Sequence, residues 1–239
     1  MTKCSVTDFH THVLPGIDDG SASVEQSLEM LRILGQQGVS RVIAVPHFYA
    51  NYDTPDRFLR KRAAAIEDLK NAMAEHPELP ELRYGAEVYY FNGMSGCDAL
   101  PELAISGTRC LLVEMPMPPW SDQMLRELRE VHDRFGLVPV IAHIDRYIRP
   151  FRTFRLPERL SELPVLVQAN ASFFIQRSTR PMALRMLKNG HIHLLGSDCH
   201  NVTTRKPNLG EALEIISNRA GMIPIEQMAA LEAELLDQQ

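Results

Sequence analysis

The sequence predicts an α/β protein built around a parallel β-sheet. Short apolar or β-branched runs recur along the chain, and amphipathic helical patterns lie between most of them. This alternation is typical of strand–helix units whose strands run parallel in one sheet. A chain of 239 residues with 45% hydrophobic residues can fill such a core as a single domain over residues 1–239.

Seven of these runs have the length and composition of buried strands. Seven strand–helix units fit either a closed barrel or an open doubly wound sheet. The first run is not followed by the G-x-G-x-x-G pattern of a dinucleotide-binding fold. The predicted strands cover residues 6–9, 41–46, 83–89, 110–115, 137–143, 164–169 and 191–196.

The first two helices are marked by their ends. Ser23 with Gln26 three residues later forms a capping box, and an apolar stripe follows it up to Gly38, which can close the helix. Thr54 followed by Pro55 predicts a second helix start, because proline is favoured at the first helical position.

The later helices show the same signals. Ser121 can cap a third helix that ends at Gly136, and Thr179 can cap another that ends near Gly190. Apolar spacing predicts a late helix around Leu209, Leu213 and Ile216, and a C-terminal helix over 225–236. Residues 92–107 and the proline-rich 116–120 are expected to be loops.

Composition bears on whether the protein binds nucleic acid, enters a membrane or leaves the cytoplasm. The chain carries 25 basic and 30 acidic residues, which gives no electrostatic footprint for nucleic acid. Residues 1–7 hold no signal-peptide pattern, and no apolar run approaches the roughly 18–20 residues of a membrane span. We expect a cytoplasmic protein, not inserted in a membrane, with an undetermined oligomeric state. The cysteines form no C-x-x-C pair and are expected to be free thiols: Cys4, Cys97, Cys110 and Cys199.

Histidines and carboxylates gather where the predicted strands end. In parallel β/α barrels this end carries the functional groups. A buried histidine or carboxylate is costly unless it is neutralised, hydrogen-bonded or metal-bound. His10 and His12 project to one face of a strand because they are two residues apart. We interpret the set as a metal site: His10, His12, His47, Glu87, Glu114, His143, Asp198 and His200, with Asn170 at the end of the sixth strand.

The remaining histidines are expected to play other roles. His76 follows a helix and is expected in solvent, and His132 lies near a helix C-terminus, where a cation is favourable. His191 and His193 lie at the start of and within the last predicted strand, away from the proposed face. Aromatic residues near the strand ends are more often packing residues, so none is assigned a role: Phe48, Tyr89, Tyr90 and Tyr147.

A series of motifs follows this pattern in order over nearly the whole chain. His10-Thr11-His12 is followed by residues 14–20, Leu-Pro-Gly-Ile-Asp-Asp-Gly, and later by Pro46-His47 and Gly85-Ala86-Glu87. Further on come Ile141-Ala142-His143 and, at residues 196–200, Gly-Ser-Asp-Cys-His. These motifs resemble those of the PHP (polymerase and histidinol phosphatase) superfamily. Residues 84–90, 112–115 and 142–147 are similar to its bacterial capsule and exopolysaccharide branch, the CpsB/CapC type.

The resemblance implies a distorted seven-stranded (β/α)7 barrel of the TIM type, the PHP fold. It also implies three divalent metal ions, Mn in the first place with Fe or Zn as alternatives. Imidazole and carboxylate ligands suit these metals. Asp18 is the alternative to Asp19, and Glu114 stands where some members of the superfamily have histidine. The implied ligands are His10, His12, Glu87 and Asp198 for the first ion; Glu87, Glu114 and His143 for the second; and Asp19, His47 and His200 for the third.

Arg146 and Arg205 match the two phosphate-binding arginines of the branch and are the implied catalytic residues. Their charge-assisted contacts would hold a phosphate. The match at Arg205 is looser because residues 201–207 are only partly similar, and the other interpretation of each arginine is a salt bridge to a carboxylate. No C-x5-R loop surrounds Cys199, so we expect this thiol to be a packing residue.

The implied function is that of a metal-dependent protein-tyrosine phosphatase, in which close metal ions activate a hydroxide that hydrolyses phosphotyrosine. The implied substrate is a tyrosine-phosphorylated protein, in particular a tyrosine kinase that controls polysaccharide assembly. Three alternatives remain at this point. They are a small-molecule PHP phosphatase such as histidinol phosphatase, a nuclease, and a non-catalytic metal-dependent module that binds phosphotyrosine.

Overall fold

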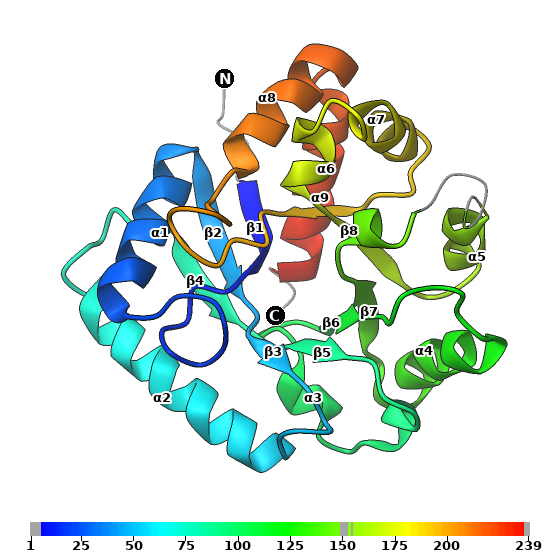
Figure 1. Ribbon diagram of the computed structural model, residues 1–239, viewed down its shortest axis with the longest axis horizontal. Coiled ribbons are helices and arrows are strands. Elements are labelled where there is room, and N and C mark those ends of the chain that lie inside the picture. The colour runs from blue at the N-terminus through cyan, green and yellow to red at the C-terminus, as the bar shows by residue number, and fades with distance from the viewer. Residues whose placement is uncertain (1–5, 149–152, 154, 237–239) are drawn as a thin grey trace.

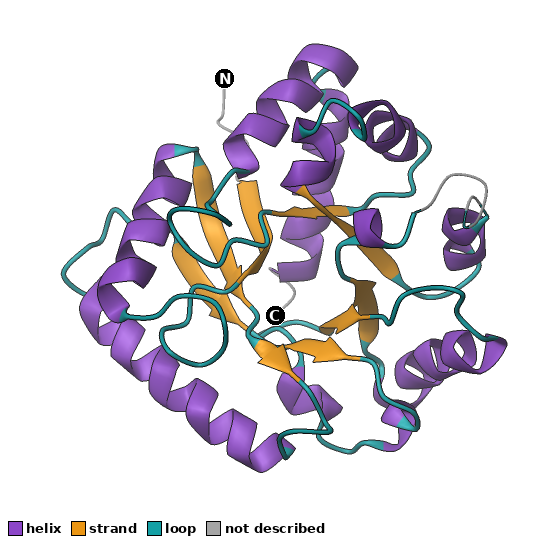
Figure 2. Cartoon of the chain, viewed as in Figure 1, coloured by secondary structure: helices purple, strands orange, loops and turns teal. Residues whose placement is uncertain are grey.

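The strands form a curled parallel sheet with helices around its outer side (Figure 1). The computed structural model describes residues 6–148, 153 and 155–236. Every strand pair within this described part is parallel. The cartoon in Figure 2 shows the strands together in the middle and the helices surrounding them. The predicted α/β class with a parallel sheet is therefore confirmed.

Nine strands appear in the described residues, where seven were predicted. The predicted strand 83–89 is divided into two, β4 and β5, and a further short strand, β3, follows the predicted strand 41–46 after Pro46, which has no N–H to donate to the ladder. The strands pair in the orders β1-β2-β4 and β3-β5-β6-β7-β8-β9. They are β1 (Val6–Thr11), β2 (Val39–Ala44), β3 (His47–Phe48), β4 (Glu81–Tyr84), β5 (Glu87–Tyr89), β6 (Cys110–Glu114), β7 (Val138–Ile141), β8 (Leu166–Asn170) and β9 (Leu194–Gly196).

The first and last strands lie beside each other. The N–H of His12 donates to the carbonyl of Cys199 at 2.9 Å, and the N–H of Asp198 donates to the carbonyl of His10 at 2.8 Å. These two bonds follow the last strand, and they bring residues nearly 190 positions apart in the sequence into one neighbourhood. The curl of the sheet thus gathers the ends of its strands on one side of the molecule.

Most of the helices cover the outer side of the sheet, and the predicted ones are all present. Two short helices replace the predicted loop 92–107, and α5 and α6 are also additions, because a helix of four to six residues shows no apolar period in the sequence. The helices are α1 (Val24–Gln36), α2 (Pro55–Met73), α3 (Leu100–Leu103), α4 (Asp122–Phe135), α5 (Leu156–Ser161), α6 (Ala171–Ile175), α7 (Arg180–Lys188), α8 (Leu209–Ala220) and α9 (Ile223–Leu236), with 3-10 turns at Met94–Gly96 and Ile144–Arg146.

Most of the predicted helix caps are confirmed. The side chain of Ser23 accepts the N–H of Gln26, and Ser121 accepts the N–H of Met124. Gly136 ends α4 with a left-handed φ of 66°, which glycine adopts without strain. The predicted cap at Thr179 is wrong. Its hydroxyl donates to the carbonyl of Phe173 at 2.8 Å and is not used to accept a helix N–H.

The interior of the curled sheet changes from apolar to polar along each strand. Ile43 and Val45 lie in an inner apolar cluster, and His47, at the next position on the same side, does not. Leu112 and Glu114 repeat the change on β6, and α9 adds Leu236 to the same cluster. Apolar packing therefore fills one end of the interior, and the polar residues gather at the carboxyl ends of the strands.

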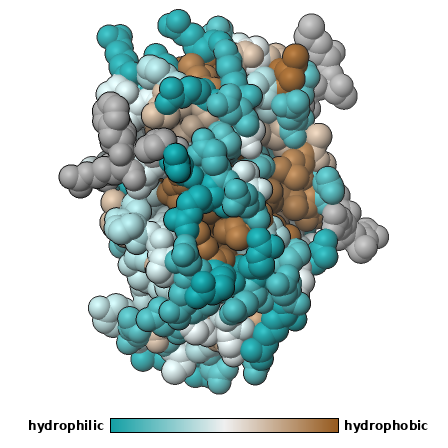
Figure 3. All heavy atoms as spheres, turned by 90° about the vertical axis from the view of Figure 1, so that its right-hand side faces the viewer, coloured by the Kyte–Doolittle hydropathy of each residue, from teal (hydrophilic) through white to brown (hydrophobic). Residues whose placement is uncertain are grey.

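The outer surface carries separate hydrophobic patches. On the side shown in Figure 3 they are divided by hydrophilic side chains. Among the described residues, the large hydrophobic side chains that are exposed lie at Tyr52, at Met117 and at the adjacent pair Met222 and Ile223. None of the helices in the described ranges is long and apolar enough to cross a membrane. Cys97, Cys110 and Cys199 are free thiols, whereas Cys4 lies outside the described residues.

Candidate metal centre

The predicted metal ligands converge at the carboxyl ends of the strands. They come from β1, β3, β5 and β6 and from the turns after β7 and β9. Most of them are fully buried, including His10, His12 and His143 at 0% exposure. The structure thus brings residues from six separate strand ends into one cluster, as the alternating pattern of the sequence predicts.

Four of these side chains surround one point. The Nε2 atoms of His10 and His12 are 3.2 Å apart. Glu87 Oε2 lies 3.3 Å from the first of these nitrogens and 3.4 Å from the second. Asp198 Oδ1 lies 3.6 Å from both. This group is the set that the resemblance implied for a first ion.

A second group shares Glu87. His143 Nε2 is 2.9 Å from Glu87 Oε1 and 3.4 Å from Glu114 Oε1. The two oxygens of Glu87 therefore face different neighbours, Oε1 toward His143 and Oε2 toward the first group. A carboxylate in this arrangement can bridge two cations.

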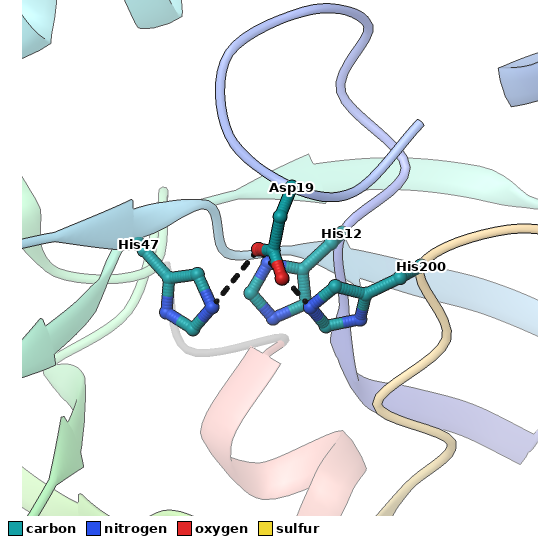
Figure 4. A group of neighbouring side chains, drawn as sticks. All are labelled: His12, Asp19, His47 and His200. Atoms are coloured by element: carbon teal, nitrogen blue, oxygen red, sulfur yellow. Dashed lines mark ion pairs between the residues drawn. The ribbon is translucent and has the colours of Figure 1, made fainter. Parts of the chain in front are cut away.

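The third group lies on the more open side of the centre (Figure 4). Asp19 Oδ1 lies 3.4 Å from His47 Nε2 and 3.5 Å from His200 Nε2. His12 also contributes a nitrogen within reach of this group, which the sequence did not predict. Asp19 is 66% exposed, and in Figure 4 its carboxylate points from the loop toward the three imidazole rings.

The structure separates the roles of the two adjacent aspartates. Asp18 Oδ2 accepts from His12 Nδ1 at 2.7 Å and from the N–H of His47 at 3.0 Å. Asp18 therefore orients the imidazole of His12 from behind, whereas Asp19 faces the open side of the cluster. A ligand histidine held in this way has its ring orientation and tautomer set by the second hydrogen bond.

Sequence reasoning missed Gln168. Its Oε1 accepts from the N–H of His143 at 2.6 Å and lies 3.3 Å from His10 Nδ1. Its amide nitrogen donates to Asn170, which in turn donates to Asp198 at 3.0 Å. The available signal was a fully polar side chain within an otherwise apolar predicted strand. Gln168 thus links three of the predicted ligands through one buried chain of hydrogen bonds.

Two of the predicted ligands have left-handed backbone conformations. His143 has φ 34° and Asp198 has φ 54°, and non-glycine residues seldom adopt either value. Such strain costs about 1–3 kcal/mol and is found mainly at functional sites. At His143 the turn redirects the side chain just after β7 ends, toward Glu87.

Close packing at Gly196 permits the approach of His10. A Cβ atom at Gly196 would lie 2.5 Å from the Cβ of His10 and 2.8 Å from Nε2 of Gln168. Any side chain at Gly196 would therefore displace the histidine that stands at the centre of the first group.

The two predicted phosphate-binding arginines border the cluster. Arg146 donates to Asp198 Oδ2 at 2.6 Å and to Glu114 at 3.2 Å. Arg205 donates to Asp198 Oδ1 at 2.8 Å. Asn201 folds the intervening loop, because its side-chain oxygen accepts the N–H of Arg205 at 3.1 Å. The two arginine side chains are 38% and 39% exposed, so both reach solvent at the mouth of the centre.

The charges of the cluster favour cations. Burial opposes ionisation, but hydrogen bonds to Asp18 and Glu87 raise the pKa of His12 to about 10. His143 is likewise buried, and hydrogen bonds to Glu114 and Glu87 raise its pKa to about 9. Burial and the charge of His12 together lower the pKa of His200 to about 4. The carboxylates therefore attract positive charge, which a metal ion can supply in place of protons.

Unpaired polar atoms at the centre fit a bound cation. Glu87 Oε2 and His200 Nε2 are buried and make no hydrogen bond to any described residue. His47 Nδ1 is 2.9 Å from Glu87 Oε2, yet the two atoms are not oriented for a hydrogen bond. Polar atoms left unpaired in the interior are costly, and coordination to a metal ion satisfies them. The donor set, all imidazole and carboxylate, suits Mn, Fe or Zn.

The residues predicted to play other roles lie away from the centre. His132 contacts the carbonyl of Leu137, and His193 accepts from the N–H of Val167. His191 and His193 precede β9, so the predicted strand start at residue 191 is wrong. His76 contacts Arg32 and is only partly exposed, which differs from the solvated position expected for it.

Comparison with known proteins gives consistent matches over the whole described chain. The family described as "Capsular polysaccharide synthesis, CpsB/CapC" matches residues 6–236. The chain is 30% identical to tyrosine-protein phosphatase YwqE of Bacillus subtilis (strain 168), over 96% of this chain and 90% of that protein. It is 26% identical to tyrosine-protein phosphatase CpsB of Streptococcus agalactiae, over 90% of each.

A solved structure is also similar. It is described among the structures of YwqE from Bacillus subtilis and CpsB from Streptococcus pneumoniae, unique metal-dependent tyrosine phosphatases. The TM-score is 0.80 at 25% sequence identity, and the match covers 97% of this chain and 94% of the other.

Proposed function

The chain belongs to the CpsB/CapC family of capsular polysaccharide synthesis proteins, and from this premise we propose that it is a metal-dependent tyrosine-protein phosphatase. Its relatives carry that name, and the similar solved structure is described as metal-dependent. The proposed reaction is hydrolysis of a phosphotyrosine monoester to tyrosine and phosphate.

One observation carries this proposal. The two oxygens of Glu87 face two different groups of imidazole and carboxylate donors, and arginines border both groups. Close cationic centres beside guanidinium groups can bind the oxygens of a phosphate. A site built to bind only protein or nucleic acid would not need buried donors that remain unpaired.

We assign the ligands as the resemblance implied, with three ions and Mn as the first choice. When bound, such ions activate water as a nucleophile near neutral pH and neutralise charge on the phosphoryl oxygens. Fe and Zn fit the same donors. The proposed sets are His10, His12, Glu87 and Asp198; Glu87, Glu114 and His143; and Asp19, His47 and His200, the last supported by the distances from Asp19 to both imidazoles.

The remaining parts of the centre position these residues and the substrate. Arg146 and Arg205 would bind the phosphate by charge-assisted hydrogen bonds, and their guanidinium groups stand at the exposed mouth of the cluster. Gln168 contacts the imidazole of His10 and Asp18 that of His12 from behind, so that the proposed ligand nitrogens face inward. Tight positioning of this kind lowers the cost of reorganisation during the reaction.

The substrate is proposed to be a tyrosine-phosphorylated protein, in particular a kinase of capsular or exopolysaccharide assembly. The family description supports this choice. A cytoplasmic location is supported by the free thiols at Cys97, Cys110 and Cys199. We also propose a single phosphoesterase domain, and the family match over residues 6–236 supports it. We further propose that the sheet closes as a distorted seven-stranded barrel, and the hydrogen bond between His12 and Cys199 supports this closure.

The test is a comparison of substrates with and without metal. The purified protein should hydrolyse tyrosine phosphopeptides and p-nitrophenyl phosphate with Mn, and chelation should abolish both activities. Full activity after metal removal would contradict the proposal. In parallel, Arg146→Ala should weaken inhibition by inorganic phosphate while metal content stays at the wild-type level.

Two outcomes would select a rival function. Faster turnover of histidinol phosphate than of a phosphotyrosyl peptide would indicate a small-molecule phosphatase. Tight binding of phosphotyrosyl peptides without any turnover, in protein fully loaded with metal, would indicate a binding module.

A further inference from the structure

Strand alternation places two tyrosines on the side of the sheet that carries the metal centre. His47 and Tyr49 are two residues apart, as are Glu87 and Tyr89, and side chains two residues apart in a strand point to the same side. β3 and β5 pair with His47 opposite Glu87 and Phe48 opposite Val88. Tyr49 and Tyr89 are therefore neighbours one step beyond the ligands, at the mouth of the centre.

Ring distances agree with this placement. The ring of Tyr49 lies 5.3 Å from that of His47 and 5.6 Å from that of Tyr89, both in tilted orientations. Both tyrosines are only partly buried. Phe48 and Tyr90, on the opposite side of the same strands, are buried in the outer hydrophobic core. Alternation thus divides the aromatic residues of this segment into packing residues and residues that face the centre.

The tyrosines also lie beside the phosphate-binding side of the centre. Tyr89 is paired in register with Glu114 on β6. The carboxylate of Glu114 accepts from Arg146 at 3.2 Å. The end of β6 therefore contacts the guanidinium of Arg146, which can bind phosphate. The same end of β6 lies next to the two tyrosine rings.

We propose that Tyr49 and Tyr89 form an aromatic wall against which the ring of a phosphotyrosine packs, so that the site selects aryl over alkyl phosphate monoesters. This inference rests on the proposed phosphatase function and names the feature that sets its substrate class. An alkyl ester such as phosphoserine is shorter and has no ring to pack. Its phosphate would contact the same phosphate-binding residues, but the ester would not gain the contact with the tyrosine rings.

The size of the effect follows from the contact. One aromatic pair contributes about 0.5–1.5 kcal/mol beyond the area that it buries, which corresponds to about a 2- to 12-fold change in an equilibrium or rate ratio. Tyr49→Leu should therefore lower kcat/KM for a phosphotyrosyl peptide by about 5-fold and leave kcat/KM for a phosphoseryl peptide of the same sequence unchanged. Tyr49→Phe keeps the ring and should retain the wild-type preference.

The experiment measures both esters with metal-loaded wild type and variants. Binding of two non-hydrolysable peptides is measured alongside, one with phosphonomethyl-phenylalanine and one with the phosphonate analogue of phosphoserine. The binding ratio gives the preference even where the alkyl ester is turned over slowly. Tyr84→Leu is the matched control, because Tyr84 is partly buried like Tyr49 but its ring packs against Arg62 and Lys70 of α2, so its variant should keep the wild-type ratio.

The proposal is supported if Tyr49→Leu lowers the aryl-to-alkyl ratio in both assays while metal content is unchanged. It is overturned if Tyr49→Leu weakens both esters equally, which would place Tyr49 as a support of His47. An unchanged ratio overturns it as well and leaves the proposed phosphatase function intact. A wild type that hydrolyses neither ester removes the proposed function itself, and this inference with it.

Discussion

A buried glutamate at the far end of the sheet leads to a sharp prediction about stability. Glu232 on α9 is 5% exposed, and its carboxylate accepts the N–H of Thr7 at 3.1 Å. Burial raises the pKa of Glu232 from 4.5 to about 8; hydrogen bonds to Thr7 and the charge of Arg41 oppose this rise, and the charge of Asp8 adds to it. The carboxyl group is therefore mostly protonated at neutral pH in the folded protein and ionised in the unfolded chain.

The direction of the pH dependence follows from these two values. A pKa that is higher in the folded state means that the unfolded state releases the proton first, so stability falls as pH rises. The contribution of Glu232 is fully present below pH 4.5 and is lost as pH rises through about 8. Between pH 6 and 8 the loss amounts to about 2 kcal/mol, from about 1.4 kcal/mol per unit of pH with a reduced slope near the pKa.

The variant Glu232→Gln tests this directly. Glutamine keeps the oxygen that accepts from Thr7 and removes the ionisation. The free energy of unfolding of Glu232→Gln, minus that of the wild type, should therefore grow by about 2 kcal/mol between pH 6 and pH 8. Urea unfolding at pH 6, 7 and 8 and at one fixed metal concentration measures it, and the pH dependence of the metal centre cancels between the two proteins.

A matched control lies on the same helix. Glu234 is exposed, so Glu234→Gln should differ from the wild type by an amount that does not change with pH. If the difference for Glu232→Gln is as flat as that for Glu234→Gln, the carboxyl group is ionised in the folded protein and the reasoning from burial is wrong.

Three further predictions concern the centre. Asp18→Ala should weaken metal binding by about 10- to 100-fold because His12 loses its orienting partner, and calorimetric titration with Mn would show this; wild-type affinity would refute it. Asn201→Ala should raise the inhibition constant of inorganic phosphate about 5-fold, because it releases the loop that carries Arg205, whereas Asn201→Asp keeps the acceptor and should not raise it. Equal inhibition constants for the two variants would contradict the role of Asn201 in holding this loop. Gly196→Ala should lower stability by about 1–3 kcal/mol, since a methyl group there meets the side chain of His10, and an unchanged melting temperature would contradict the close packing.

Several parts of the fold were predictable because they depend on local chemistry. Ser23 and Ser121 cap helices because a hydroxyl beside free N–H groups accepts from them in any fold. The same reasoning was wrong at Thr179, whose hydroxyl finds a carbonyl of α6 instead. Short helices such as α3 also escaped prediction, since they depend on packing against neighbouring elements.

The candidate site was predictable in its members and not in its connections. His10 and His12 share a face through strand periodicity alone, and the other donors follow from their place at strand ends. Gln168 was missed because a single polar residue in a strand carries no signal until its neighbours are known. Asp18 and Asp19 could not be told apart in the sequence, and their separate contacts with His12 and His47 distinguish them.

The sequence by itself determines the α/β class, the order of most elements and the donor residues, because the periodicities of 2.0 and 3.6 residues and the residue types are local properties of the chain. Only the tertiary structure decides which donors share Glu87, which tyrosines reach the mouth and which carboxyl group remains protonated. These depend on distances between residues far apart in the sequence and on the exclusion of water, which arise when the curled sheet brings its strand ends together.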